Sequence, residues 1–244
     1  MDDLQAQVKS AVRHFWNTRN TQSESQGALT GLKDAGFRTA VTGGKHHDGF
    51  VDVFRKILIN AGLPDANIHW NKKRELPGYF RAEKSWDLLV VVDGHLLAVL
   101  EYKAQVGPSF GNNFNNRTEE SLGNATDLWA AYREGAFKPS ERPWLGYVFV
   151  LEDCPKSTTP VKFKEPHYKV FPEFKGASYA KRYELLLLKL LRERLYDGAS
   201  LIMTKATEGA TGDYTCPCAE LDILAFATSL TAHAMAFVQM RKNK

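Results

Sequence analysis

The stretch from Trp86 to Lys103 most constrains the fold, because it has the pattern of two buried strands joined by a tight turn. Residues 88–92 and 96–100 are entirely apolar, and Asp93-Gly94 between them is a strong signal for a β-hairpin. Strands that are apolar along their whole length are typically covered on both faces. We therefore expect this hairpin to lie centrally in its sheet.

Three charged residues interrupt this apolar stretch. Asp87 precedes the first strand, and Glu101 and Lys103 close the second. A charge that enters a buried sheet costs free energy unless it is paired or bound to a metal ion. The spacing Asp-x13-Glu-x-Lys therefore indicates a chemical site, although such charges are also found as solvated ends of strands.

The register of the hairpin decides whether these three side chains meet. Glu101 and Lys103 are two residues apart and share a face. A two-residue loop would place Asp87 opposite Leu100 and hence on the other face. A three-residue loop over residues 92–94, or a bulge or bend near Asp87, would bring Asp87 to the face of Glu101 and Lys103. The catalytic interpretation predicts one of these irregularities.

Hydrophobic periodicity and turn signals divide the rest of the chain into alternating helices and strands. The order predicts an α/β fold with a central mixed sheet flanked by helices, with helices added at both ends. No composition shift marks a boundary, so residues 1–244 are expected to form a single domain. The expected helices cover about 3–19, 48–61, 118–134, 178–196 and 219–240; the expected strands cover 68–76, 144–151 and 201–207; and loops cover 20–47, 107–116 and 152–176.

Composition places the chain among ordinary cytoplasmic proteins. No apolar run reaches membrane-spanning length, the first residues do not resemble a signal peptide, and three cysteines make no disulfide framework. The net charge of +4 permits an anionic partner. We expect no membrane association.

Beyond the hairpin, two further stretches carry a resemblance: Thr21-Gln-Ser-Glu-Ser-Gln-Gly27 and Gly43-Gly-Lys-His-His-Asp-Gly-Phe50. Together with residues 86–103 they resemble the XhoI family of type II restriction endonucleases. The αβββαβ order with Asp87 and Glu101-Tyr-Lys103 is similar to the PD-(D/E)XK nuclease fold. Trp86 stands where that motif commonly has proline.

The resemblance implies a homodimer that cuts double-stranded DNA at the palindrome CTCGAG with Mg²⁺. It also implies 5′-phosphate and 3′-hydroxyl products and a DNA methyltransferase as functional partner in the cell. A palindromic site suits a two-fold dimer, because each subunit then makes identical contacts. The apolar surface of the last expected helix is compatible with that interface or with the core.

In such a nuclease, Asp87 and Glu101 would bind Mg²⁺, which takes one or two carboxylates and keeps several waters. The carbonyl of Tyr102 would be a further ligand. Lys103 would lie beside the scissile phosphate, where it can orient the attacking water or stabilise the developing negative charge. A third acidic residue often completes such sites, and the candidates are Glu24, Asp48 and Asp52.

Candidate DNA contacts divide into phosphate and base contacts. Asparagine suits adenine and arginine suits guanine in the major groove, but an Asn-Gly-rich segment is also a simple turn and a basic run is also a solvated surface. A repair or recombination nuclease, or a non-catalytic DNA-binding α/β protein, remains an alternative. The phosphate candidates are Lys45, His46, Lys72, Lys73 and Arg74, and the base-reading candidates are Asn113, Asn115, Asn116 and Arg117.

Overall fold

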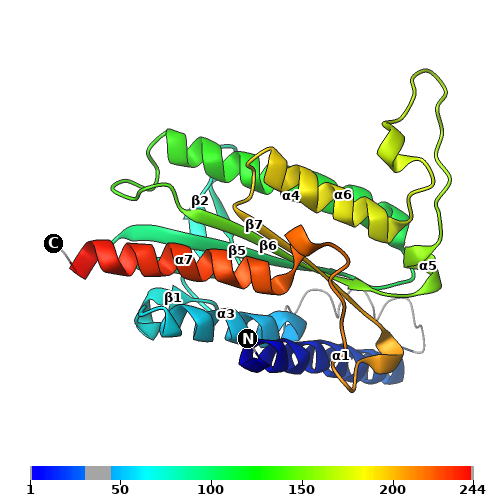
Figure 1. Ribbon diagram of the computed structural model, residues 1–244, viewed down its shortest axis with the longest axis horizontal. Coiled ribbons are helices and arrows are strands. Elements are labelled where there is room, and N and C mark those ends of the chain that lie inside the picture. Colours follow the sequence, from blue (N-terminus) through cyan, green and yellow to red (C-terminus); the bar gives the residue numbers. More distant parts are fainter. Residues whose placement is uncertain (1, 31–44, 243–244) are drawn as a thin grey trace.

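The computed structural model describes residues 2–30 and 45–242, without the side chains of residues 2 and 22–30. Five described strands form a mixed sheet in the order β1-β4-β5-β6-β7 (Figure 1). The first three pair antiparallel, and β5, β6 and β7 are parallel. The bounds are β1 Ile68–His69, β4 Leu88–Val92, β5 His95–Gln105, β6 Trp144–Glu152 and β7 Gly198–Thr204, with a separate ribbon of β2 Glu75–Pro77 and β3 Glu83–Ser85.

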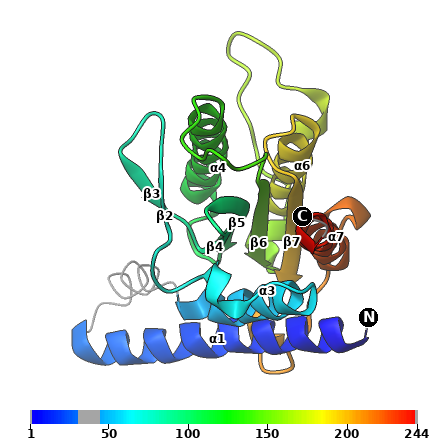
Figure 2. The same cartoon turned by 90° about the vertical axis from the view of Figure 1, so that its left-hand side faces the viewer.

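Helices cover both faces of the sheet, as expected for a mixed α/β fold (Figure 2). One face carries α1, α3 and α7, and the other carries α4 and α6. The α-helices are α1 Asp2–Thr30, α3 Asp48–Asn60, α4 Phe110–Arg133, α5 Pro155–Thr158, α6 Tyr179–Arg192 and α7 Ile223–Lys242; short 3₁₀ turns are η1 Lys45–His47, η2 Asp65–Asn67, η3 Pro172–Phe174, η4 Ala206–Glu208 and η5 Ala219–Leu221.

The hairpin strands are buried on both faces, which confirms the central position expected from their apolar runs. Leu88 and Val90 pack toward α3 and α7, whereas Leu89 and Val99 pack toward α4 and α6. Because successive residues of a strand point to opposite faces, one apolar run supplies both halves of the core.

A β-bulge sets the hairpin register. The turn at Asp93-Gly94 has two residues, both with positive φ (+48° and +77°), and Val91 pairs with Leu96 whereas Val90 pairs with Ala98. Leu97 is therefore the extra residue. Beyond the bulge Leu88 pairs with Leu100, so the next residue, Asp87, lies in line with Glu101. The bulge supplies the one-residue shift that the catalytic interpretation required, but it lies at Leu97, opposite Val90 and Val91, and not near Asp87 as expected.

Several element boundaries differ from the sequence prediction. The first helix continues beyond residue 19 to Thr30, and the remainder of the expected loop, 31–44, lies outside the described residues. The strand expected over 68–76 is interrupted, because β1 ends at His69 and β2 begins at Glu75. Residues 70–73 between them form a bend that includes Lys73 at φ +56°. The last helix begins at Ile223 rather than residue 219, since Asp222 accepts a hydrogen bond of 2.7 Å from the Leu224 N–H.

The loop expected over residues 107–116 is also wrong, because α4 begins at Phe110. Phe110 is buried, and the rings of Phe110 and Phe114 pack against Tyr179, with centroids 5.9 and 6.4 Å apart. This packing outweighs the low helix propensity of the Gly and Asn residues between the two phenylalanines. Asn112, Asn113 and the residues that follow them are therefore helical.

Among the described helices, α7 alone is long and apolar enough, by length and composition, to cross a membrane. Ile223, Phe226, Leu230 and Ala234 of this helix are buried in the core cluster. Its apolar character thus follows in part from packing on the sheet, whereas Met235 and Met240 are exposed.

Candidate active site

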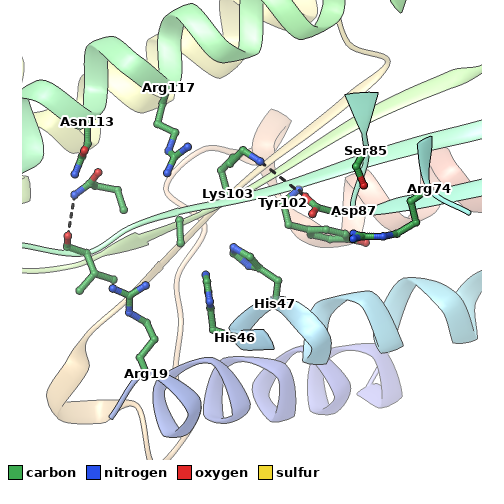
Figure 3. A pocket seen from close by; sticks show the side chains of 13 residues that line it. Arg19, His46, His47, Arg74, Ser85, Asp87, Tyr102, Lys103, Asn113 and Arg117 are labelled. Atoms are coloured by element: carbon green, nitrogen blue, oxygen red, sulfur yellow. Dashed lines mark hydrogen bonds and ion pairs between the residues drawn. The ribbon is translucent and has the colours of Figure 1, made fainter. Parts of the chain in front are cut away.

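A cavity of about 440 Å³ opens where the C-terminal half of β5 passes α1, η1 and the start of α4 (Figure 3). The carboxyl end of a strand beside a helix start is a common place for a binding site in α/β folds. Its lining residues are Arg19, His46, His47, Arg74, Ser85, Asp87, Tyr102, Lys103, Ala104, Gln105, Val106, Asn113 and Arg117.

The structure brings the three predicted charged residues together. Lys103 Nζ forms a close ion pair with the carboxylate of Glu101 and lies 4.0 Å from Asp87 Oδ2. The backbone N–H of Tyr102 donates a hydrogen bond of 2.7 Å to the same Asp87 oxygen. Neighbouring strands thus hold two carboxylates and one ammonium group at one point of the sheet.

Glu101 lies directly behind the cavity wall, and its side chain is 3% exposed. A second lysine reaches it from the ribbon, since Lys84 Nζ lies 3.0 Å from Glu101 Oε2. The Lys84 ammonium also lies 4.0 Å from the centroid of the Trp86 ring, a cation–π contact. Two ammonium groups therefore compensate one buried carboxylate.

Burial and the mutual charges of Asp87, Glu101 and Lys103 shift the pKa values of these three side chains in different directions. Burial and the nearby Glu101 charge raise the pKa of Asp87 to about 6. Burial alone would raise the pKa of Glu101, but Lys103 and Lys84 outweigh it and hold that pKa below its usual range. Burial would likewise lower the pKa of Lys103, but Glu101 and Asp87 raise it. Glu101 and Lys103 are therefore charged at neutral pH, and Asp87 is largely ionised.

The donor set suits a small, hard divalent cation. Mg²⁺ is commonly held by one or two carboxylates, with waters and phosphate oxygens completing its coordination. Asp87 and Glu101 supply two carboxylates on opposed strands, and the Lys103 ammonium now lies between them, where it balances their charge. Among the described side chains, those of residues 3–21 and 45–242, no cluster of three or more His, Cys, Asp or Glu offers a richer site.

The opposite wall of the cavity is basic and aromatic. Arg19 from α1 and Arg117 from α4 point into the cavity from opposite sides (Figure 3). His46 and His47 are buried, and the Nδ1 atom of each has no hydrogen-bond partner among the described residues. Burial and the charge of Arg19 lower the pKa of His46 to about 4. Burial and the neighbouring His46 lower the pKa of His47. Both imidazoles are therefore neutral at pH 7.

Four of the proposed DNA-contact residues line the cavity: His46, Arg74, Asn113 and Arg117. Arg74 Nη1 also donates a hydrogen bond of 3.0 Å to the carbonyl of Trp86, which holds the segment that leads into β4. The other five are exposed and lie outside the lining: Lys45, Lys72, Lys73, Asn115 and Asn116.

The three candidates for a third acidic residue lie in two different helices, α3 and α1. Asp48 and Asp52 lie in α3 outside the cavity lining, and Asp52 forms ion pairs with Arg55 at 3.6 Å and Lys56 at 2.7 Å. Glu24 falls in the part of α1 whose side chains lie outside the described residues.

Sequence reasoning did not include Arg19, Ser85, Lys84 or Gln105 in the site. Arg19 follows the buried Phe15 by one helical turn, so the helical period was the available signal that it points toward the core side of α1. No comparable local signal exists for Lys84, because its contact with Glu101 depends on how the ribbon lies against the sheet.

A family model for the restriction endonuclease XhoI matches residues 26–216. Type II restriction enzyme BstVI of Geobacillus stearothermophilus is 54% identical over 206 residues, which are 82% of this chain and 92% of that enzyme. XhoI of Xanthomonas vasicola is 45% identical over 186 residues, 75% of this chain and 74% of that enzyme. AbrI of Azospirillum brasilense is 45% identical over 168 residues, 68% and 75% of the two chains. No solved structure matches the chain significantly.

Proposed function

The chain belongs to the XhoI family of type II restriction endonucleases, and from this premise we propose that it cuts both strands of DNA at the palindrome CTCGAG with Mg²⁺. Its relatives are named type II restriction enzymes, which are site-specific deoxyribonucleases. The proposed recognition sequence and metal rest on the likeness to this family. The observation that carries the proposed chemistry is the convergence of Asp87, Glu101 and Lys103.

We also propose that the core is of the PD-(D/E)XK type and that residues 1–244 form one nuclease domain. Helix α3, strands β1, β4 and β5, helix α4 and strand β6 have the αβββαβ order, with the ribbon of β2 and β3 inserted between β1 and β4. The acidic pair lies on β5 and just before β4, where this fold would have its metal ligands. One sheet supports both core clusters, which is consistent with a single domain.

In the proposed reaction Asp87 and Glu101 would hold Mg²⁺, which when bound supplies charge neutralisation at the phosphate and a lower pKa of its water. Lys103 would hold the attacking water or a phosphate oxygen and stabilise the negative charge that develops at phosphorus. Water forms the new bond to phosphorus as the bond to the 3′ oxygen breaks. The attacking water gives a proton to the solvent and the leaving 3′ oxygen takes one from the solvent, so the products are a 5′-phosphate and a 3′-hydroxyl.

The remaining cavity wall suits an anionic backbone. His46, Arg74 and Arg117 would hold phosphate oxygens beside the cleaved bond, with Arg19 facing Arg117, and Asn113 would reach a base edge or phosphate. Glu24 is kept as the proposed third acidic residue. The exposed residues Lys45, Lys72, Lys73, Asn115 and Asn116 would contact DNA outside the cavity.

The proposed partners follow from a palindromic substrate. A homodimer would let each subunit cut one strand, and the exposed apolar residues Met235 and Met240 of α7 offer one surface for it. A DNA methyltransferase would protect the host sequence, and the cytoplasm, where the chromosome of a bacterium lies, would be the place of action.

A plasmid digest tests the proposal. Plasmid DNA with one CTCGAG site is incubated with the protein in Mg²⁺ or in EDTA, alongside Lys103→Ala. A single Mg²⁺-dependent cut at that site, absent with the variant, is the expected result. Cuts at other discrete sites would contradict the proposed specificity, and cuts that follow DNA structure would favour a repair nuclease. Binding without cutting in any divalent metal would favour a non-catalytic DNA-binding protein.

A further inference from the structure

The ribbon of β2 and β3 ends in a tip, residues 78–81, that presents two aromatic side chains to solvent. Tyr79 is 54% exposed and Phe80 is 70% exposed, and their rings meet edge to face with centroids 4.9 Å apart. Aromatic side chains held rigidly at a surface are typical of binding sites, because they lose little conformational entropy on contact.

A buried carboxylate fixes this tip on α4. Asp127 Oδ1 accepts hydrogen bonds of 2.8 Å from the backbone N–H groups of Tyr79 and Phe80, and Asp127 Oδ2 accepts one of 2.8 Å from Arg81 Nε. Arg81 Nη2 donates to Asn124 Oδ1 at 3.2 Å. A Cβ at position 78 would lie only 2.6 Å from Asp127 Oδ2, so Gly78 permits the close approach. The hydrogen bonds that compensate this buried carboxylate therefore also hold the tip in position.

The tip lies on the same side of the molecule as the candidate active site. One face of α4 serves both the cavity and the tip. Asn113 and Arg117 line the cavity, and Asn124 and Asp127 hold the tip. Successive members of this set are four, seven and three residues apart, spacings that keep them on the same face of a helix. The base of the ribbon continues into the cavity, because Ser85 lines it and Lys84 contacts Glu101. Figure 2 shows the ribbon standing beside α4.

Charge and shape both match duplex DNA. Residues 72–85 carry five basic side chains, of which Arg81 and Lys84 already pair with Asp127 and Glu101. The exposed Lys72 and Lys73 at the base of the ribbon are the ones that suit a phosphate backbone. The major groove admits a two-stranded β-ribbon, and phenylalanine makes apolar contact with the thymine methyl group there. Asp127 lies ten residues beyond Arg117, which is roughly 15 Å along the axis of α4. The same length along the axis of a DNA duplex spans about four to five nucleotides of one strand.

We propose that the ribbon enters the major groove of the bound duplex and that Tyr79 and Phe80 contact base edges about four to five nucleotides from the cleaved phosphate. The inference rests on the proposed function, since the duplex is the substrate of that reaction. It adds two specificity-determining residues, with Asp127 as the residue that positions them.

Equilibrium binding tests the contact separately from cutting. A fluorescent duplex with a central CTCGAG site is titrated in Ca²⁺ with the wild-type protein, the double variant Tyr79→Ala/Phe80→Ala and the control Leu122→Ala. Leu122 is 41% exposed on the same helix but points away from the face that carries Arg117. We expect the double variant to bind at least about tenfold more weakly and the control to bind like the wild type. Equal affinity of the double variant and the wild type would overturn the inference.

Photocross-linking locates the contact. Thymines of the duplex are replaced one at a time by 5-iodouracil, whose iodine takes the place of the methyl group in the major groove. After irradiation and trypsin digestion, the cross-link is expected in the peptide Glu75–Arg81, since trypsin cuts after Arg74 and Arg81. Cross-links confined to other peptides would contradict the inference.

The outcomes separate the inference from the proposed function. If the wild type binds through the tip but never cuts, the proposed reaction fails and the inference stands. If the wild type cuts at CTCGAG and the double variant binds and cuts equally well, the inference fails and the reaction stands. A double variant with unchanged DNA affinity but a changed mass by light scattering would show that the tip contacts a second copy of the chain, which also overturns the inference.

Discussion

The backbone N–H of Tyr102 on β5 donates a hydrogen bond of 2.7 Å to the carboxylate of Asp87, which precedes β4. This bond holds Asp87 on the same face as Glu101 and Lys103, and it is possible because the bulge at Leu97 shifts the register of the two strands by one residue. Without the shift, the two-residue turn would align Asp87 with Leu100 on the other face. One extra residue in a buried strand therefore assembles the candidate active site.

Replacing Lys103 by alanine removes the group proposed to stabilise negative charge at the phosphate. Glu101 keeps Lys84 as a partner at 3.0 Å, so the fold is retained. We expect single-turnover cleavage to fall by about 10²-fold or more, while DNA affinity in Ca²⁺ changes only a few-fold. Lys181→Ala, which removes an exposed lysine paired with Glu184 on α6, is the control and should cleave normally. Cleavage by Lys103→Ala at the wild-type rate would remove this residue from the mechanism.

The sequence predicted the central hairpin and its three charges because that information is local. Apolar runs, a turn dipeptide and charges at fixed spacing all lie within residues 86–103. The register could be reduced to a few alternatives, but the bulge was not identified, since nothing in the residues around Leu97 distinguishes it from its neighbours. Because both faces of these strands are apolar and packed, the hydrophobic pattern by itself does not distinguish the registers.

The other parts of the site depend on contacts between distant segments. Arg19, Lys84 and Arg117 meet near β5 from three different elements. The helical start of α4 was missed because Gly and Asn favour turns, whereas Phe110 and Phe114 pack on Tyr179 of α6. Such long-range packing outweighs local propensity and leaves no signal within a short window of sequence.

Lys84 should both stabilise the fold and compete with a metal ion. Replacing it by glutamine leaves the buried Glu101 with one cationic partner, and we expect the free energy of unfolding in EDTA to fall by about 3 kcal/mol. Because a competing charge is removed, Mg²⁺ should raise the melting temperature of the variant more than that of the wild type. Thermal melts in EDTA and in Mg²⁺ measure both effects.

Lys189→Gln is the matched control for Lys84→Gln. Lys189 also pairs with a glutamate, Glu173 at 2.8 Å, and lies 5.6 Å from the centroid of the Phe171 ring, but it is much more exposed. Its loss should cost less than about 1 kcal/mol and should leave the Mg²⁺ response unchanged. Equal effects of the two substitutions would contradict a special role of the buried pair.

The buried His46 should make stability depend on pH. Burial holds its pKa at about 4 in the folded protein, below the value of about 6.5 in an unfolded chain. Between these values the unfolded state binds more protons, so this histidine lowers the free energy of unfolding as pH falls from 6.5 toward 4. We expect the wild type to lose about 1.5 kcal/mol more than His46→Gln between pH 6.5 and 5.

Urea unfolding in EDTA at the two pH values measures this difference, and the packing cost of the substitution cancels because it is present at both. His167→Gln, at an exposed position, is the control and should lose as much stability as the wild type. An identical pH dependence of His46→Gln and the wild type would show that burial of this imidazole does not affect folding.

Asp127 should hold the ribbon tip in a single conformation. Asp127→Asn removes the charge that receives two backbone N–H groups and Arg81, so the amide protons of Tyr79 and Phe80 should exchange faster. Hydrogen exchange followed in the peptide Glu75–Arg81 measures this, while peptides from β5 and β6 should keep their protection. DNA affinity should fall although both aromatic side chains are present, because the freed tip loses conformational entropy on binding.

Glu165→Gln is the control for Asp127→Asn. It removes a carboxylate that accepts the Val170 N–H at 2.9 Å, and it should change hydrogen exchange only around its own segment. Unchanged exchange at Tyr79 and Phe80 in Asp127→Asn would show that the tip is held by other contacts and that Asp127 does not position it.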